Sequence, residues 1–187
     1  GAPPHNPSGA LHEAVKSGMQ LIVIDPRRTE AARLAAVHLQ CRPGEDPTVI
    51  GGLIRAILAG ALHDQAFVRE HATGVEALRQ AVEPFTPEYV ERRADVPREL
   101  LLRAARIFAT GRQGFAVVGT GPNMAPRGTL TEYLTLCLNT LCGRWLRAGE
   151  PLRNPGVLTP ATHPRAQPIA SVPAWGFGEP MRVRGFT

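Results

Sequence analysis

The stretch LIVIDPRRTEAARLAAVHLQCRPGED, residues 21–46, decides the fold that the sequence predicts. It opens with four aliphatic residues, Leu21 to Ile24, and such a short apolar run indicates a strand buried on both faces of a parallel sheet. Asp25-Pro26 ends this strand. Thr29 is placed to cap a following helix, which we expect over residues 30–37.

A second short strand is expected over residues 38–42, and it also ends in an acidic turn, Pro43-Gly44-Glu45-Asp46. The carboxyl ends of parallel strands meet at one edge of a sheet, where ligands bind in open α/β folds. We therefore expect Asp25 and Asp46 to lie together. A carboxylate accepts two hydrogen bonds side by side, which suits guanine N1–H and its N2 amine, or the two hydroxyls of a ribose. Taken singly, Asp46 could simply cap a helix and Asp25 could be a turn residue.

The whole chain predicts an α/β fold, a Rossmann-like three-layer domain over residues 1–145 with a short, mostly parallel sheet. A small helical insert is expected over about 64–95, and an irregular Pro/Gly-rich extension over 146–187. Further helices are expected over 7–17, 46–59, 97–110 and 130–141, and a third short strand over 115–118. Residues 1–4 read as a turn after a strand, so we expect that strand to precede this sequence in a longer chain.

The composition is that of a globular protein, with 43% hydrophobic and 20% charged residues among 187. The net charge is +5 and Lys16 is the only lysine, but acidic residues are dispersed among the arginines, so no nucleic acid is expected as a partner. The three cysteines indicate small core residues in a reducing compartment. The most apolar segment, 49–62, is too short to span a membrane. A cytoplasmic location is expected.

Two further features could contact a ligand. Arg27 and Arg28 follow Asp25 directly, and an arginine fork suits a phosphate. Gly119-Thr120-Gly121 ends the expected third strand, where glycines allow a backbone to approach a ligand closely. Met124 stands where a dinucleotide fingerprint has its third glycine, so the turn is a weak signal for a nicotinamide cofactor. No HExxH, HxxxH or GxSxG pattern is present, and we predict neither catalytic residues nor metal ligands in this chain.

The segment 21–46 resembles the molybdopterin oxidoreductase family, also called the dimethyl sulfoxide reductase family. That family's pattern here is a hydrophobic strand, DPR with a following Thr, an Ala-rich helix, then PGTD and a long helix. The later segment GTGPNMAPRGTLTEYLTLCLNTLCGRWLRAG resembles the family's glycine turn and following helix, so that the likeness covers roughly residues 1–150. Three positions depart from the pattern: Glu45 replaces the usual Thr, Ala36 a common Asp, and Pro3 the Asn of a GxNP turn.

The resemblance implies a large enzyme that holds molybdenum or tungsten between two pterin–guanine dinucleotides, often with an iron–sulfur cluster near its amino terminus. The matching domain grips one guanosine diphosphate arm. The implied cofactor-binding residues lie in four turns: Gly1, Ala2, Pro3 and Pro4; Asp25, Pro26, Arg27 and Thr29; Gly44, Glu45 and Asp46; and Thr120, Gly121, Asn123 and Met124. The cysteine motif for the cluster and the protein ligand of the metal are expected elsewhere in the longer chain.

We therefore interpret the chain as a cofactor-binding domain of a molybdopterin guanine dinucleotide oxidoreductase, inactive when isolated. Its partners would be the remaining domains of the same polypeptide and an unknown redox partner. One alternative is a cofactor-free scaffold of the same fold, as in the large subunit of respiratory NADH dehydrogenase. Retention of Asp25 and Asp46 argues against it. Another alternative is a nicotinamide-binding domain, disfavoured by the missing third glycine.

Overall fold

The computed structural model describes residues 7–150 of the chain. The chain divides into two compact units, 1–150 and 151–187. The second unit, and with it most of the extension predicted over 146–187, lies outside the described residues. The elements are α1 (Pro7–Lys16), β1 (Ile22–Ile24), α2 (Glu30–Leu34), β2 (Val37–Leu39), α3 (Asp46–Ala59), α4 (Gln65–His71), α5 (Val75–Val82), α6 (Pro87–Ala94), α7 (Arg98–Thr110), α8 (Thr120–Asn123) and α9 (Gly128–Leu141).

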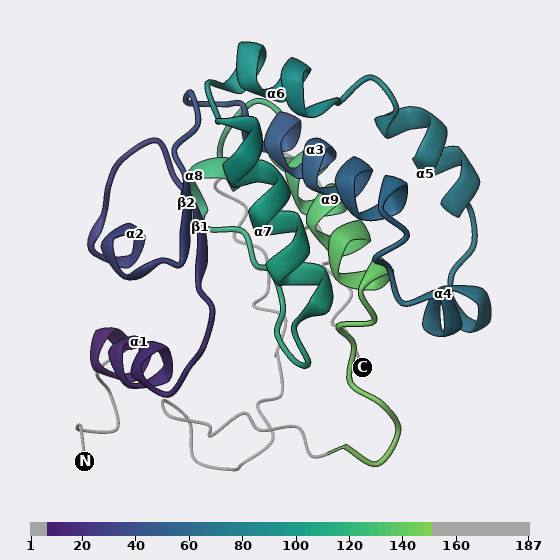
Figure 1. Ribbon diagram of the computed structural model, residues 1–187, viewed down its shortest axis with the longest axis horizontal. Helices are drawn as coiled ribbons and strands as arrows, with labels where there is room; N and C mark the ends of the chain where they lie inside the picture. Colours follow the sequence, from purple (N-terminus) through teal and green to yellow (C-terminus); the bar gives the residue numbers. More distant parts are fainter. Residues whose placement is uncertain (1–6, 151–187) are drawn as a thin grey trace, which may run out of the picture. The chain divides into compact units, whose positions relative to one another are not determined.

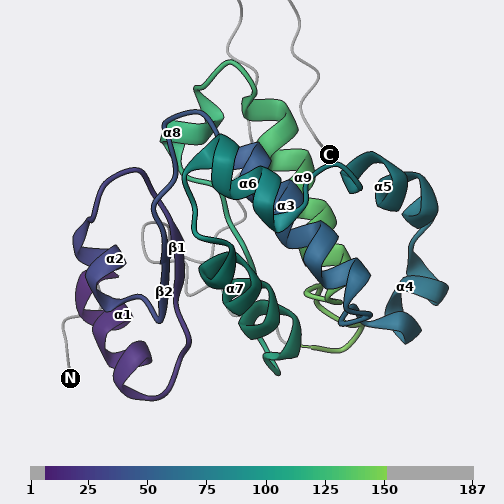
Figure 2. The same cartoon turned by 45° about the horizontal axis from the view of Figure 1, so that its top comes forward.

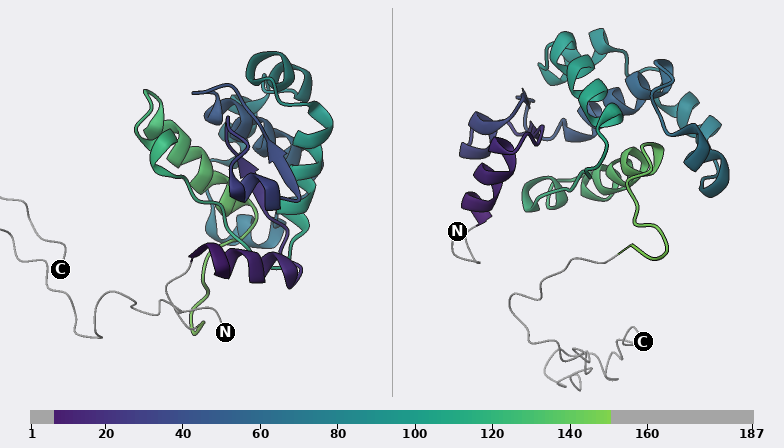
Figure 3. Two further views of the ribbon diagram at one scale, coloured as in Figure 1. Left: turned by 90° about the vertical axis from the view of Figure 1, so that its left-hand side faces the viewer. Right: turned by 60° about the horizontal axis from the view of Figure 1, so that its bottom comes forward.

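The described residues form three layers around a short sheet. Strands β1 and β2 pair in parallel, with Val23 opposite His38. Helices α1 and α2 lie on one side of the sheet, and α7, α3 and α9 lie on the other (Figure 1). The same order can be followed in Figure 2, and the left panel of Figure 3 looks at the sheet from the side of α1 and α2. The predicted α/β class with a short parallel sheet is therefore confirmed.

The two strands differ in burial. In β2, Val37 and Leu39 are buried while His38 between them is half-buried, the alternation of a strand with one face on the core. Strand β1 is half-buried throughout, so the prediction of a strand buried on both faces is wrong. The reason is that α7 packs against β2, whose Val37 and Leu39 belong to the buried core, whereas Ile22 and Ile24 of β1 lie only at the margin of that core.

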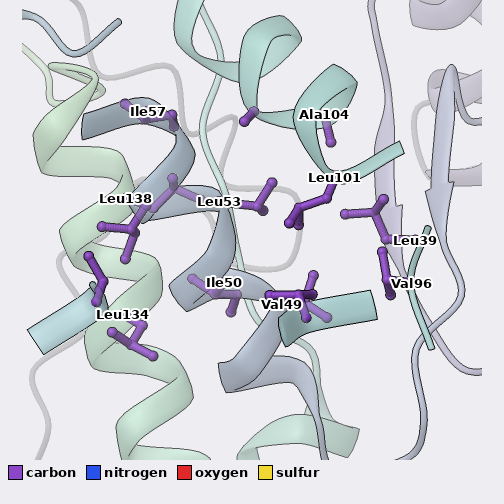
Figure 4. Packing of buried hydrophobic residues seen from close by; sticks show 14 of the residues in the cluster. Leu39, Val49, Ile50, Leu53, Ile57, Val96, Leu101, Ala104, Leu134 and Leu138 are labelled. Carbon is purple, nitrogen blue, oxygen red and sulfur yellow. The ribbon is translucent and has the colours of Figure 1, made fainter. Parts of the chain in front are cut away.

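Helix α3 is the centre of the packing, against α5, α6, α7 and α9. Figure 4 shows Ile50, Leu53 and Ile57 of α3 together with Leu134 and Leu138 of α9 in the buried cluster, which also includes Val49 and Leu101. The close approach of α6 and α7 requires a glycine in α3. A Cβ at Gly52 would come within 2.6 Å of Val90 Cγ2 and 3.1 Å of Leu101 Cδ2.

The predicted helical insert over about 64–95 is confirmed as α4, α5 and α6. Three local predictions are wrong. Glu45, not Asp46, is the N-cap residue of α3, and α9 begins at Gly128 instead of at the expected residue 130. Residues 115–118 form no strand. Instead, the Ala116 N–H donates to Asn139 Oδ1 (2.8 Å), and Asn139 Nδ2 donates to the Ala116 carbonyl (2.9 Å), so a side chain takes the place of a neighbouring strand.

Candidate functional site

The turn after β1 is held by β2. The Arg27 N–H donates to Asp25 Oδ1 (2.7 Å). His38 Nε2 lies 2.9 Å from the Asp25 carbonyl oxygen and donates to it in the Nε2–H tautomer, while Gln40 Nε2 donates to the Pro26 carbonyl (3.0 Å). Sequence reasoning missed His38 and Gln40. The available signal was their spacing of two, which places both on one face of an extended segment, here next to the turn of the neighbouring strand.

Thr29 caps α2 as predicted, since its hydroxyl accepts from the Ala32 N–H at 3.2 Å. Arg27 and Arg28 are exposed, and neither side chain forms an ion pair with another described residue. Both guanidinium groups are thus open to an anion outside the described chain. The short helix α2, capped by Thr29, follows them and fixes the backbone at this position.

The turn before α3 carries two acidic residues that are buried to a similar extent, each 8% exposed. Gly44 precedes them with φ +84°, a left-handed conformation that glycine adopts without steric cost. The Glu45 carboxylate is fully occupied within the protein. It accepts from Thr48 Oγ1 (2.6 Å) and pairs with Arg93 (2.8 Å) and Arg127 (3.4 Å).

The Asp46 carboxyl is in the opposite electrostatic situation. Burial raises its pKa, its own backbone hydrogen bond lowers it, and the negative charges of Asp25 and Glu45 raise it further. No described residue provides a cation for it. The Cys41 thiol lies near the same carboxylates, and its burial together with the negative charges of Asp46 and Asp25 raises its pKa to about 12. Asp25 and Asp46 are therefore close enough for their charges to interact.

The turn after residue 118 forms the short helix α8 in place of a loop. Thr120, Gly121, Asn123 and Met124 are all exposed, Met124 at 82%. A Cβ at Gly119 or at Gly121 would meet no protein atom within 4 Å, and neither residue has a positive φ. Nothing in the described chain requires glycine at these two positions, and the space beside them is open.

Arg127, the N-cap residue of α9, contacts one of the predicted turns. Its Nη2 donates to the Gly44 carbonyl (2.8 Å) and to Glu45 Oε1 (3.4 Å). Sequence reasoning missed Arg127 and Arg93, because no local pattern signals contacts across 82 and 48 positions. The structure thus attaches the 44–46 turn to the start of α9 through Arg127, and Asp25 lies near enough to this turn for its charge to raise the pKa of Asp46. Gly1, Ala2, Pro3 and Pro4 lie outside the described residues.

Two kinds of feature are absent from residues 7–150. Among these residues, no group of three or more His, Cys, Asp or Glu side chains is arranged to hold a metal ion. No helix in the same range has the length and apolar character needed to cross a membrane.

Comparison with known proteins places these features in a class. No protein-family model matches the chain. It is 35% identical over 145 residues to the acetylene hydratase of Syntrophotalea acetylenica, covering 78% of this chain and 20% of that protein. It is 32% identical over 130 residues to formate dehydrogenase H of Escherichia coli, and the match covers 70% of this chain and 18% of that protein. It is 31% identical over 137 residues to the probable oxidoreductase YoaE of Bacillus subtilis, and the match covers 73% of this chain and 20% of that protein.

The solved structure of acetylene hydratase from Pelobacter acetylenicus matches with a TM-score of 0.72 and 27% identity, over 75% of this chain and 19% of that one. The fold and its acidic edge define an α/β domain of the kind that binds ligands beyond its strand ends. The chain belongs to the molybdopterin oxidoreductase family, in which the cofactor carries molybdenum or tungsten. It spans about a fifth of the length of the curated relatives it matches.

Proposed function

We propose that this domain holds the guanine nucleotide arm of a molybdopterin guanine dinucleotide cofactor within a larger oxidoreductase. The observation that carries the proposal is the pair Asp25 and Asp46. Their charges interact, and Asp46 lacks a cation partner among the described residues. A ligand that donates two adjacent N–H groups would relieve this repulsion, whereas a phosphate would increase it. Guanine presents such a pair of donors, so the carboxylates suit the base and not the diphosphate.

The diphosphate would be bound on either side of the carboxylates. Arg27 and Arg28 are exposed and free of ion pairs within residues 7–150, as phosphate-binding arginines need to be. The open space at Gly119 and Gly121 would admit a ligand against the backbone of α8. The residues present therefore fit the group. When bound, the metal of the cofactor supplies the redox chemistry, and this domain orients and encloses the nucleotide end.

An iron–sulfur cluster, a substrate site and the other domains of the polypeptide would belong to the remaining four fifths of the relatives' length. The matched share of each relative, 18–20% for the three described above, supports the proposal that further domains hold these groups. Oxygen-atom, hydride or electron transfer is proposed for the whole protein. The choice among these reactions depends on groups outside this chain.

The test has two parts. Metal analysis of the full-length protein should find molybdenum or tungsten together with guanine nucleotide released on denaturation. If the metal is absent, the chain is instead a scaffold that has kept the fold without the cofactor. In the second part, the full-length apoprotein is titrated with guanosine diphosphate and with NADH. Tighter binding of NADH would favour a nicotinamide-binding domain. Asp46→Asn should weaken the binding of guanosine diphosphate and leave the binding of NADH unchanged.

A further inference from the structure

The contacts of Glu45 with Arg93 and Arg127 connect three segments that are distant in sequence. Arg127 Nη2 reaches the Gly44 carbonyl at 2.8 Å and the Glu45 carboxylate at 3.4 Å. Arg93 Nη2 contacts the same carboxylate oxygen at 2.8 Å from the end of α6. The Glu45 side chain is 10% exposed, whereas those of Arg93 and Arg127 are 53% and 47% exposed. We call these three residues the Glu45 clasp.

The Glu45 carboxylate at the centre of the clasp is ionised and has hydrogen-bond and ion-pair partners within the protein. Burial would raise the pKa of Glu45, but the hydrogen bonds from Thr48 and Arg93 and the charges of Arg93 and Arg127 lower it below its ordinary value. Every one of these partners belongs to the protein itself. Glu45 therefore acts on the cofactor turn through its neighbours, and not as a group that receives a ligand.

The clasp also extends to the α8 turn. Arg127 is the N-cap residue of α9, and the Gly128 N–H donates to the Ala125 carbonyl at 2.9 Å. A Cβ at Gly128 would overlap the Asn123 carbonyl oxygen, so this glycine lets the end of α8 lie directly against the start of α9. A displacement of Arg127 would therefore be transmitted to Asn123 and Met124.

We propose that Arg127 is a positioning residue that holds the 44–46 turn and the 120–124 turn at a set separation, with Glu45 as its buried counter-ion. This inference rests on the proposed function, because the two turns are taken to contact one nucleotide. The Gly44 carbonyl is the point of attachment, and it lies two residues before Asp46. Loss of Arg127 leaves Glu45 with Thr48 and Arg93, but it releases the Gly44 carbonyl and with it the link to α9.

The experiment compares Arg127→Gln with Arg55→Gln in the full-length apoprotein. Arg55 is a matched control, since it too donates to a backbone carbonyl, of Glu83 (2.9 Å), and pairs with a carboxylate (3.6 Å), but between α3 and the end of α5. Guanosine diphosphate affinity is measured by calorimetry. Arg127→Gln should weaken binding about tenfold, Arg55→Gln should not change it, and both should lower the melting temperature similarly. Arg127→Lys should restore part of the affinity, since lysine donates without a fork.

A double-mutant cycle with Glu45→Gln separates positioning from direct contact. If Arg127 acts through the clasp, the two substitutions together cost less affinity than the sum of their separate effects. If Arg127 binds phosphate directly, the effects add, and guanosine binding is unchanged while diphosphate binding falls. That result would overturn the positioning role, as would wild-type affinity in Arg127→Gln. If the unsubstituted apoprotein binds no guanine nucleotide, the proposed function itself fails.

Discussion

The carboxyl groups of Glu45 and Asp46, adjacent residues at the start of α3, have pKa values displaced in opposite directions. Both residues are buried to the same degree. Burial raises the pKa of both carboxyl groups. For Glu45 the hydrogen bonds from Thr48 and Arg93 and the charges of Arg93 and Arg127 outweigh it, whereas for Asp46 the charges of Asp25 and Glu45 add to it. Ionised Glu45 thus stabilises the folded domain, whereas ionised Asp46 has no positive partner among the described residues.

We expect Asp46→Asn to stabilise the domain at pH 7 by on the order of 1 kcal/mol, because it removes a buried negative charge that Asp25 and Glu45 also repel. A raised carboxyl pKa means that the folded state binds its proton more tightly than the unfolded state. The gain should therefore be present above the folded pKa and vanish as the pH falls to about 4. Urea unfolding between pH 4 and 8 measures this, and a destabilised variant at pH 7 would contradict the repulsion.

Glu45→Gln should change stability with the opposite sign, destabilising the domain at neutral pH. It removes hydrogen bonds to a charged group, which costs about 1.5–3 kcal/mol per interaction in comparable cases. Because the folded pKa is depressed, the stabilisation by Glu45 is complete above the ordinary value of 4.5 and is lost as the pH falls through the folded pKa. The same urea titration, extended to more acidic pH so that it passes through the folded pKa of Glu45, measures this, with Glu83→Gln as a control for an exposed ion-paired acid. A pH-independent difference would show that the clasp charge is not responsible.

Gly44→Ala should destabilise the domain by about 1–2 kcal/mol through backbone strain alone. The residue has φ +84°, and a Cβ there would meet nothing within 4 Å, so no clash contributes. Gly44→Asn should cost less, since asparagine tolerates the left-handed region. Gly121→Ala is the matched control: its φ is not positive and its Cβ position is open, so thermal unfolding should show no loss of stability. Equal effects of the two alanines would contradict this explanation.

The thiols should be unreactive in the folded protein. Burial and the neighbouring acids raise the pKa of Cys41 to about 12, and burial raises that of Cys142 to about 11. At pH 8 almost no thiolate forms, and the thiolate is the nucleophile. Iodoacetamide followed by mass spectrometry should therefore find both residues unmodified in native buffer and alkylated in urea. Rapid native labelling of Cys41 would show that it does not lie in the field of Asp25 and Asp46.

Some features could be predicted from sequence because they depend on neighbouring residues. Proline at the second position of α3, the hydroxyl cap of Thr29 and the glycine before α5 are local signals, and the corresponding helices form. The proximity of Asp25 and Asp46 was also predictable, since parallel strands end at one edge. The 115–118 strand was not, because an apolar run becomes a strand only if another strand pairs with it.

By itself, the sequence determined the two short strands, the acids that follow them and the glycine turns, since each depends on residues within one turn of helix or one strand. Only the tertiary structure decided that Glu45 pairs with Arg93 and Arg127 while Asp46 has no cation partner within residues 7–150. Those contacts require α6 and α9 to pack on α3, and this packing is set by buried side chains such as Val90 and Leu134. Charges far apart in sequence pair only where such a core brings their helices together.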